Sequence, residues 1–277
     1  MRLSIRHVTT YTYTAPVAFG LQQLRLTPKS RLGQSVLTWS TRIEGGVREL
    51  DYDDQHANQV MLVSFSGQGI GDGEEDGSVL RVISEGDIET ADTAGILGKH
   101  AGFAPLWYFR HATARTRTGN GVRALARGLN TDVPDEITRF HTLSERIRET
   151  VEYATGATHA QTDAESSIAL GSGVCQDHAH VFVAAARHLG YPARYVSGYL
   201  MMDDRVEQEA SHAWAEVHID PLGWVGYDVS NGISPDERYV RVATGLDYGE
   251  AAPITGIHLG QAEGEELTVA IEVQQQQ

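Results

Sequence analysis

The sequence has a single cysteine, Cys175, among its 277 residues. One cysteine cannot form a disulfide within the chain, so a small fold held together by disulfides is excluded. No apolar run approaches the roughly 18–20 residues of a membrane-spanning helix, so we expect no membrane partner. Residues 1–8 alternate instead of forming the apolar centre of a signal peptide. Together with the lone thiol, this favours a cytoplasmic location.

Positive charge is also scarce. The chain has 22 Lys and Arg residues against 37 Asp and Glu residues, which gives a net charge of −15. Proteins that bind nucleic acid usually present a basic face, so nucleic acid is not an expected partner. A hydrophobic content of 41% suits a soluble globular protein with one large core or two smaller ones. The pattern predicts no particular oligomeric state.

The first hundred residues have the texture of β structure. Alternation begins at residues 3–13, and β-like runs follow at residues 21–26, 35–43, 59–65 and 79–83. Turn-forming glycine, aspartate and proline residues separate these runs. The pattern becomes helical after residues 100–106. We therefore predict a β-rich N-terminal domain over residues 1–105 and a second domain over residues 106–277.

Three helices are expected in the second domain. The first has Pro134 in its first turn, and its apolar stripe consists of Ile137, Phe140, Leu143, Ile147 and Val151. A short second helix is predicted to begin at Thr162, where Glu165 three residues later completes a capping box. The third runs from about Cys175 to His188, because Gly190 stops it.

Strand-like segments follow the third helix, at residues 193–200, 213–219 and 224–228. In the middle segment one face carries Ala215, Val217 and Ile219, and the other carries Trp214, Glu216 and His218. Late strands are expected at residues 237–243 and 266–273. The second domain is therefore expected to combine helices with an antiparallel sheet.

Cys175 lies where a glycine-rich loop, Gly171-Ser172-Gly173, runs into the third helix. The first N–H groups and the dipole of a helix favour a thiolate, and with a nearby imidazolium the pKa of a cysteine can fall from about 8.5 to between 3.5 and 7.5. The same N–H groups can stabilise an oxyanion. A lone cysteine is also commonly a buried small apolar residue, so position alone does not decide its role.

His212 and Asp228 supply the remaining parts of a cysteine nucleophile site. His212 starts one expected strand and Asp228 ends the next, so a hairpin with its loop at residues 221–223 would bring them together. Either residue alone is more often structural. In the order cysteine, histidine, aspartate they favour a catalytic triad of nucleophile, base and orienting carboxylate.

Two other chemistries are disfavoured. His178, His180 and His188 share the third helix, but residues two apart on a helix point in nearly opposite directions. The zinc-binding spacing His-Glu-x-x-His is absent, so neither a metal nor another cofactor is expected. Ser197 lies in Tyr195-Val196-Ser197-Gly198-Tyr199, which is not the Gly-x-Ser-x-Gly motif of serine hydrolases.

The motifs around these residues closely resemble those of the bacterial transglutaminase-like cysteine protease family. The matching core stretches are Gly173-Val174-Cys175-Gln176-Asp177-His178-Ala179-His180, residues 189–199, His212-Ala213-Trp214-Ala215-Glu216-Val217, and Gly223-Trp224-Val225-Gly226-Tyr227-Asp228. Residues 7–17 and 24–28 resemble the β-rich domain that precedes this core in the family. Gly245-Leu246-Asp247-Tyr248 also resembles the family. The sequence departs at Asp228-Val229-Ser230-Asn231, where family members often have Pro-Thr after the aspartate.

The resemblance implies an α+β fold. It consists of a β-sandwich-like N-terminal domain and a papain-like, transglutaminase-like core with helices packed on an antiparallel sheet. It also implies Cys175, His212 and Asp228 as the triad. The leading hypothesis is a cysteine hydrolase that cleaves a peptide or isopeptide bond in a peptide or protein substrate through a thioester. The alternatives are acyl transfer to an amine and an inactive protein-binding module, because the fold does not fix the reaction.

Overall fold

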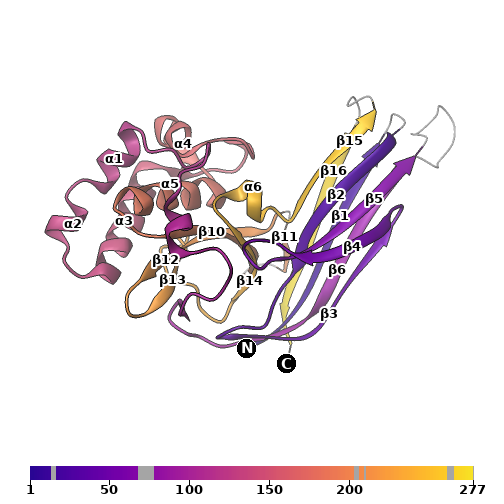
Figure 1. The fold of residues 1–277 in the computed structure, drawn as a ribbon, viewed down its shortest axis with the longest axis horizontal. Helices are drawn as coiled ribbons and strands as arrows, with labels where there is room; N and C mark the ends of the chain where they lie inside the picture. The colour runs from indigo at the N-terminus through magenta and orange to yellow at the C-terminus, as the bar shows by residue number, and fades with distance from the viewer. Residues whose placement is uncertain (14–16, 68–77, 203–205, 209, 261–264, 277) are drawn as a thin grey trace.

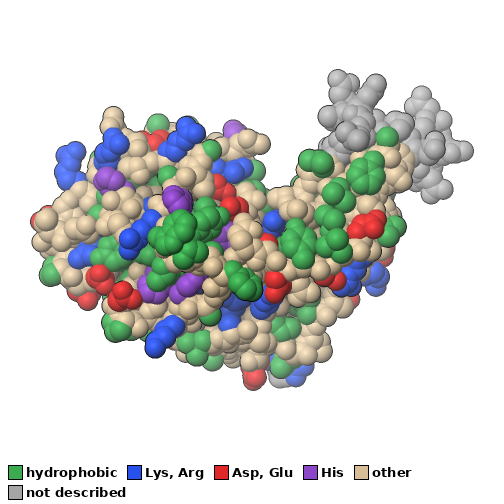
Figure 2. All heavy atoms as spheres, viewed as in Figure 1, with side chains coloured by type: hydrophobic (Ala, Val, Ile, Leu, Met, Phe, Trp, Pro, Cys, Tyr) green, Lys and Arg blue, Asp and Glu red, His purple; other side chains and the backbone are tan. Residues whose placement is uncertain are grey.

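The computed structural model in Figure 1 describes all residues except 14–16, 68–77, 203–205, 209, 261–264 and 277. The chain forms two halves. One consists of long strands, and the other is a sheet with helices packed on it. On the face in Figure 2, basic and acidic side chains are interspersed over both halves. In the described part of the chain, no helix has the length and apolar character needed to cross a bilayer.

The first half has two antiparallel sheets. One has the order β11-β16-β1-β6-β3, with strands β11 (Glu207–Gln208), β16 (Glu265–Gln275), β1 (Arg2–Tyr13), β6 (Ser78–Thr90) and β3 (Gln34–Glu44). The other has the order β15-β2-β5-β4, with strands β15 (Ile254–Gly260), β2 (Val17–Thr27), β5 (Gln59–Gly67) and β4 (Val47–Asp53). Every β-like run predicted in the first hundred residues is a strand.

Alternation explains how the two sheets face each other. In β1, alternate side chains from Leu3 to Tyr13 are buried, as a strand with one covered face requires. Tyr11 and Tyr13 of the first sheet share one apolar cluster with Leu24 and Val63 of the second. The prediction of a sandwich-like β domain is therefore confirmed.

The second half contains a five-stranded antiparallel sheet of order β14-β10-β12-β13-β7. Its strands are β14 (Tyr239–Gly245), β10 (Ala193–Leu200), β12 (His212–Ile219), β13 (Gly223–Tyr227) and β7 (Ile96–Gly98). Ala215, Val217 and Ile219 of β12 are buried in the main core together with Phe182 of the central helix. The predicted division of β12 into two faces is confirmed, because only the Ala215 face packs in that core.

Helix α5 (Cys175–His188) is the central helix and packs on β12. The other helices are α1 (Asn120–Ala126), α2 (Leu129–Asp132), α3 (Glu136–Thr150), α4 (Ala164–Leu170) and α6 (Tyr248–Ala251), with a 3-10 turn at Leu106–Arg110 and short strands β8 (Glu152–Tyr153) and β9 (Ser172–Gly173). Figure 1 shows α1 to α5 grouped on the side of the molecule away from the β domain, whereas α6 lies next to the β domain. The predicted α+β class, with helices packed on an antiparallel sheet, is confirmed.

Two helix starts differ from the prediction. Pro134 precedes the first turn of α3 instead of lying in it, because Asp135 is the N-cap and accepts a hydrogen bond from the Thr138 N–H. The second helix begins at Ala164, after an Asp163 cap, and not at Thr162. Glu165 does not complete a capping box on its own helix, because its carboxylate accepts hydrogen bonds from the start of α1.

The last two strands return to the β domain, although the sequence grouped them with the second domain. β16 pairs antiparallel with β1 along its length, and β15 pairs with β2. A second apolar cluster joins the halves, since Ile5 and Ile271 of the β domain contact Tyr199 and Val240 of the core sheet. The division at residue 105 stays a prediction, and the end of the chain belongs spatially to the first half.

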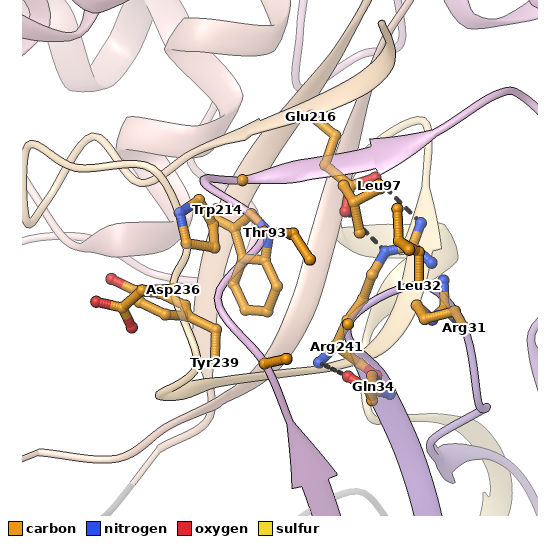
Figure 3. A pocket seen from close by; sticks show the side chains of 14 residues that line it. Arg31, Leu32, Gln34, Thr93, Leu97, Trp214, Glu216, Asp236, Tyr239 and Arg241 are labelled. Carbon is orange, nitrogen blue, oxygen red and sulfur yellow. Dashed lines mark hydrogen bonds and ion pairs between the residues drawn. The ribbon is translucent and has the colours of Figure 1, made fainter. Parts of the chain in front are cut away.

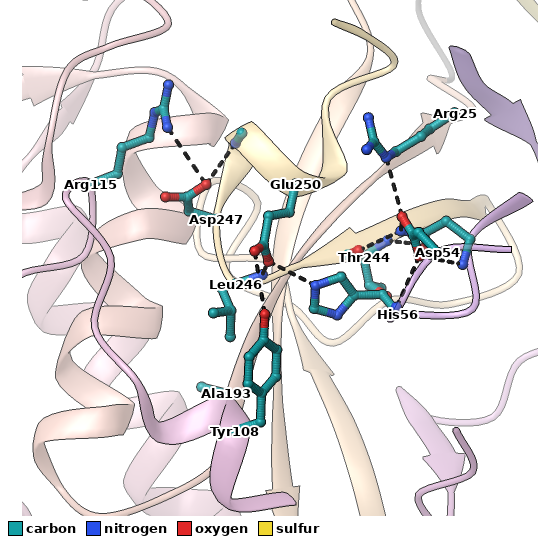
Figure 4. A network of polar contacts seen from close by, with 12 residues as sticks. Arg25, Asp54, His56, Tyr108, Arg115, Ala193, Thr244, Leu246, Asp247 and Glu250 are labelled. Atoms are coloured by element: carbon teal, nitrogen blue, oxygen red, sulfur yellow. Dashed lines mark hydrogen bonds and ion pairs between the residues drawn. The ribbon is translucent and has the colours of Figure 1, made fainter. Parts of the chain in front are cut away.

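Polar contacts also join the two halves at α6, as Figure 4 shows. The Glu250 carboxylate accepts a hydrogen bond from the Leu246 N–H at 2.7 Å and contacts the His56 ring at 2.7 Å. Asn58 exchanges hydrogen bonds with the backbone of Thr244, at 2.7 and 2.8 Å. The loop that contains His56 and Asn58 is therefore fixed against β14 of the core sheet.

Candidate active site

Cys175 is the first residue of α5, and the loop before it is held in place by Asp177. The Val174 N–H and the Thr158 hydroxyl donate to Oδ2 of Asp177 at 2.8 and 2.6 Å. A Cβ atom at Gly173 would lie 2.8 Å from the Asp177 side chain, so the close approach requires glycine. This arrangement fixes Cys175 at the helix N-terminus, as the sequence predicted.

The Cys175 side chain is half-buried. It packs against an apolar cluster that includes Ala179, Tyr195, Ala213 and Ala251. The thiol is therefore supported on one side by α5, β10, β12 and α6, and it keeps part of its surface accessible. This combination differs from a fully buried structural cysteine.

The predicted hairpin brings His212 and Asp228 together. Strands β12 and β13 pair with Ala215 opposite Tyr227, which places the start of one strand beside the residue that follows the other. Nε2 of His212 lies 2.6 Å from Oδ2 of Asp228. Both residues are buried, at 8% and 1% exposed. The bond at Nε2 leaves Nδ1 as the ring nitrogen available to a second group.

Cys175 is that second group, because its side chain interacts with the His212 ring and acts to raise the pKa of the ring. Burial by itself would lower the pKa of His212. The interactions with Asp228 and Cys175 outweigh burial and raise the pKa of His212 to about 10. His212 thus interacts with Asp228 through a hydrogen bond and with Cys175 electrostatically. At neutral pH the ring carries its proton.

The Asp228 carboxylate is held by more partners than the sequence predicted. The Tyr239 hydroxyl and the Asn231 side-chain amide each donate to Oδ2 at 2.7 Å, and the Asn231 N–H donates to Oδ1. Burial would raise the pKa of Asp228, but its hydrogen bonds with His212, Asn231 and Tyr239 lower it. The carboxylate therefore stays ionised beside the charged imidazole. Asn231 lies in the segment where the sequence departs from the family pattern. That departure was the one feature of the sequence that could have pointed to the contact between Asn231 and Asp228.

Aromatic rings enclose the same pair. Trp214 stacks on the His212 ring with centroids 6.2 Å apart, and the Tyr239 ring lies 5.9 Å from it. Trp214 and Tyr239 also pack on each other, with ring centroids 5.5 Å apart. These rings exclude water from one side of the imidazole and fix its orientation.

Comparison with known proteins shows which families the sequence matches. The model of the transglutaminase-like superfamily matches residues 123–229, a span that contains Cys175, His212 and Asp228. The model of the bacterial transglutaminase-like N-terminal region matches residues 3–69. The chain therefore has a transglutaminase-like core and a bacterial transglutaminase-like N-terminal region.

Relatives share both the sequence and the fold of this transglutaminase-like chain. An uncharacterized protein of Mycobacterium leprae is 27% identical over 98% of each chain. An uncharacterized protein of Mycobacterium tuberculosis is 35% identical over 47% of this chain and 45% of its own length. The fold also matches the crystal structure of a Cytophaga hutchinsonii protein proposed to be a cysteine protease, with a TM-score of 0.72 and 18% identity over 99% and 98% of the two chains. The superfamily match supports a cysteine hydrolase or acyltransferase as the class of protein.

The histidines of α5 have other partners in the transglutaminase-like core. The His178 ring contacts the Val151 carbonyl and the Ser230 hydroxyl, both at 2.8 Å. His180 accepts a hydrogen bond from the Tyr248 N–H at 3.1 Å and packs on Tyr195. Burial lowers the pKa of both, so they stay neutral. Within the described residues, no three His, Cys, Asp or Glu side chains lie close enough together to hold a metal ion.

Proposed function

We propose that the protein is a cysteine hydrolase that cleaves an amide bond, in a peptide or isopeptide linkage, through a thioester on Cys175. The observation that carries the proposal is the 2.6 Å hydrogen bond between His212 and Asp228, together with the effect of Cys175, which acts to raise the pKa of the same His212 ring. In this proposal Cys175 is the nucleophile, His212 is the acid and base, and Asp228 orients and stabilises the imidazolium.

The reaction proceeds in two steps, acylation of the cysteine and hydrolysis of the thioester. The Cys175 sulfur, after its proton passes to His212, bonds to the carbonyl carbon of the substrate. The carbon–nitrogen bond then breaks as His212 gives that proton to the leaving amine, and a thioester remains. Water attacks the thioester, loses a proton to His212 and releases the carboxylic acid. The sulfur leaves as a thiolate while that proton stays on His212, which restores the resting pair.

In both the acylation and the hydrolysis step, negative charge develops on the carbonyl oxygen and needs hydrogen-bond donors. The Cys175 N–H is suitable, because the first N–H groups of a helix have no partner within the helix. α5 has 14 residues, so its dipole adds to the same effect. The Cys175 N–H is therefore the proposed oxyanion donor.

The proposed space for substrate is a pocket of about 160 Å³ near the start of β12. It is lined by Ser211, which precedes His212, and by Tyr248, which packs against the same apolar cluster as Cys175. Its other walls come from the β domain, including Tyr11, Leu267 and Val269. We expect an extended peptide or protein segment there, so the β domain would take part in binding. We also expect the enzyme in the cytoplasm, where its thiol would stay reduced.

The experiment that tests the proposal follows the acyl group. Wild type and Cys175→Ala are incubated with a panel of peptide amide donors, with water alone or with a primary amine, and products and enzyme are analysed by mass spectrometry. We expect carboxylic acid products and an acyl adduct on Cys175 with wild type, and neither with Cys175→Ala. His188→Ala, which changes an exposed histidine of the same helix, is the matched control and should retain the activity.

Two outcomes would overturn the proposal. Amine incorporation without hydrolysis would make the protein a transglutaminase that uses the same three residues. If no donor gives either product and Cys175 acquires no acyl group, the inactive protein-binding module becomes the better account.

A further inference from the structure

A second pocket, of about 230 Å³, lies at the junction of the two halves, and we call it the junction pocket. Two of its walls are the loops at residues 29–31 and 56–58 of the β domain, and the others come from the core sheet and the segment at residues 97–101. Its charged lining residues are all basic: Lys29, Arg31, Lys99, Arg194 and Arg241. No described residue that lines it is acidic.

The nearest buried charges do not balance. Arg194 and Arg241 are both buried, and both bind the carboxylate of Glu216, at 2.5 and 2.7 Å from their Nε atoms. Glu216 is completely buried. One carboxylate therefore binds two guanidinium groups. Its single negative charge balances only one of them, so one positive charge remains uncompensated. Buried charges are normally paired, because an unpaired one loses its hydration.

Arg31 adds a third guanidinium to this group. Figure 3 shows it beside Arg241, on the side away from the aromatic rings of Trp214 and Tyr239. Its Nε donates to the Lys29 carbonyl at 3.4 Å, and no carboxylate of the described residues lies within ion-pair distance of it. Burial lowers the pKa of Arg31 to about 10; Glu216 acts to raise this pKa and Arg194 to lower it. Two positive charges thus remain uncompensated around Glu216.

The lining offers further partners for an anion. Lys99 is exposed at the pocket wall, so its ammonium is free to turn toward a ligand. Lys29 is already paired with Asp53 at 2.7 Å and contributes less. The His56 ring donates from Nε2 to the Glu250 carboxylate at 2.7 Å, so it is not counted among the anion donors. Lys99 therefore adds a mobile cation to the guanidinium groups of the pocket.

We propose that the junction pocket binds a compact dianion of the phosphate class, as free phosphate or as a phosphate monoester. Its charge matches the two uncompensated positive charges. Guanidinium groups present paired N–H donors that fit tetrahedral oxyanions. The volume is below the roughly 300 Å³ at which sites for drug-sized ligands begin, which suits a small group. Because Arg31 belongs to the β domain and Arg194 and Arg241 to the core, the anion joins the two halves.

Calorimetric titration of the full chain tests this proposal. Inorganic phosphate and glycerol 2-phosphate are titrated separately, in buffers matched for ionic strength with chloride. Wild type is expected to bind phosphate saturably, and Arg31→Ala is expected to weaken binding by about tenfold or more, the usual effect of losing a charged hydrogen bond. Arg42→Ala is the matched control, because Arg42 is an exposed arginine of β3 that pairs with Glu44 outside the pocket. Tighter binding of the monoester would identify a phosphorylated ligand.

Thermal unfolding supplies a second readout. Arg31→Met removes a cation that lacks a counter-ion, so without phosphate the variant should melt at the same temperature as wild type or higher. In phosphate the wild type should gain more in Tm than the variant. The proposal is overturned if wild type shows no saturable binding, or if Arg31→Ala binds phosphate as tightly as Arg42→Ala does. Neither readout uses catalytic activity, so both are independent of the proposed hydrolase.

Discussion

At the scale of single residues, the orientation and charge of the His212 imidazole depend on how firmly Asp228 is held. Three donors converge on its Oδ2 atom, from His212, Asn231 and Tyr239. Burial and the adjacent carboxylate raise the pKa of Tyr239, so its hydroxyl stays a protonated donor over the working pH range. Tyr239 is therefore a positioning residue, which acts on His212 through Asp228.

Replacing Tyr239 by phenylalanine should lower kcat/KM by roughly 10- to 100-fold, the effect expected from losing a hydrogen bond to a charged group. The pH profile should change in a specific direction. The Tyr239 hydroxyl lowers the pKa of Asp228, so its removal should move the acid limb of kcat/KM to higher pH. Steady-state kinetics from pH 4 to about 8 measure both effects.

Tyr227→Phe is the matched control for that variant. The Tyr227 hydroxyl is buried and has no hydrogen-bond partner within the described structure. Its removal should leave the pH profile in place and keep or increase the free energy of unfolding, because an unsatisfied buried hydroxyl is lost. If the acid limb of kcat/KM lies at the same pH in Tyr239→Phe and Tyr227→Phe, Tyr239 does not act on the His212–Asp228 pair.

At the scale of secondary-structure elements, α1 depends on a residue of another helix. The N-cap of α1, Gly119, has no side chain to accept a hydrogen bond. Glu165 of α4 takes that role, and its carboxylate accepts from the N–H groups of Gly119, Gly121 and Val122 at 2.8 to 2.9 Å. The negative charge also interacts favourably with the start of the helix. Glu165 therefore fastens α1 to α4, beside α5.

Glu165→Gln should reduce the free energy of unfolding by about 1–3 kcal/mol, because the charged acceptor of three N–H groups becomes a neutral one. Urea unfolding followed by circular dichroism measures the change in midpoint. Glu145→Gln, on the exposed side of α3, makes the same chemical change without such contacts and should stay near wild type. Equal midpoints for the two variants would contradict the assigned role.

The sequence predicted elements better than contacts between them. Cys175, His212 and Asp228 could be selected because each lies where a helix or strand begins or ends. Glu165 was recognised as a capping residue but assigned to its own helix, since nothing in the local spacing points to Gly119. β4 was missed because all of its side chains are exposed, and a strand without a buried face shows no alternation. The contact of Tyr239 with Asp228 depends on the pairing of β14 with β10, which the sequence does not specify.

At the scale of the whole molecule, the C-terminal strand closes the β domain. β16 pairs with β1 from Leu3 opposite Gln275 onward, so the two ends of the chain meet. Ile271 and Val273 are each 1% exposed and belong to the cluster between the halves. This arrangement was not predicted, because strand pairing between distant segments leaves no trace in local periodicity. It makes the β domain dependent on residues more than 200 positions away.

A chain truncated after residue 253 should therefore lose the folded β domain. Burying side chains such as Ile271 and Val273 contributes roughly 1.5–3 kcal/mol each, and a domain's whole stability is about 5–15 kcal/mol. The unpaired edges of β1 and β2 add to the loss. Limited proteolysis compares the truncated and full chains, with cleavage sites read by mass spectrometry. A truncated chain that resists cleavage within residues 1–90 as well as the full chain does would contradict this dependence.

The account as a whole requires the Cys175 sulfur to pass its proton to His212, and the rate of thiol alkylation measures this directly. Because the chain has one cysteine, every iodoacetamide adduct reports on that sulfur. At pH 6 wild type should react faster than free cysteine, and the rate should persist toward higher pH because the raised pKa of His212, about 10, keeps its proton in place. His212→Ala should abolish the advantage. A wild-type rate no faster than that of the denatured chain would contradict the proposed site.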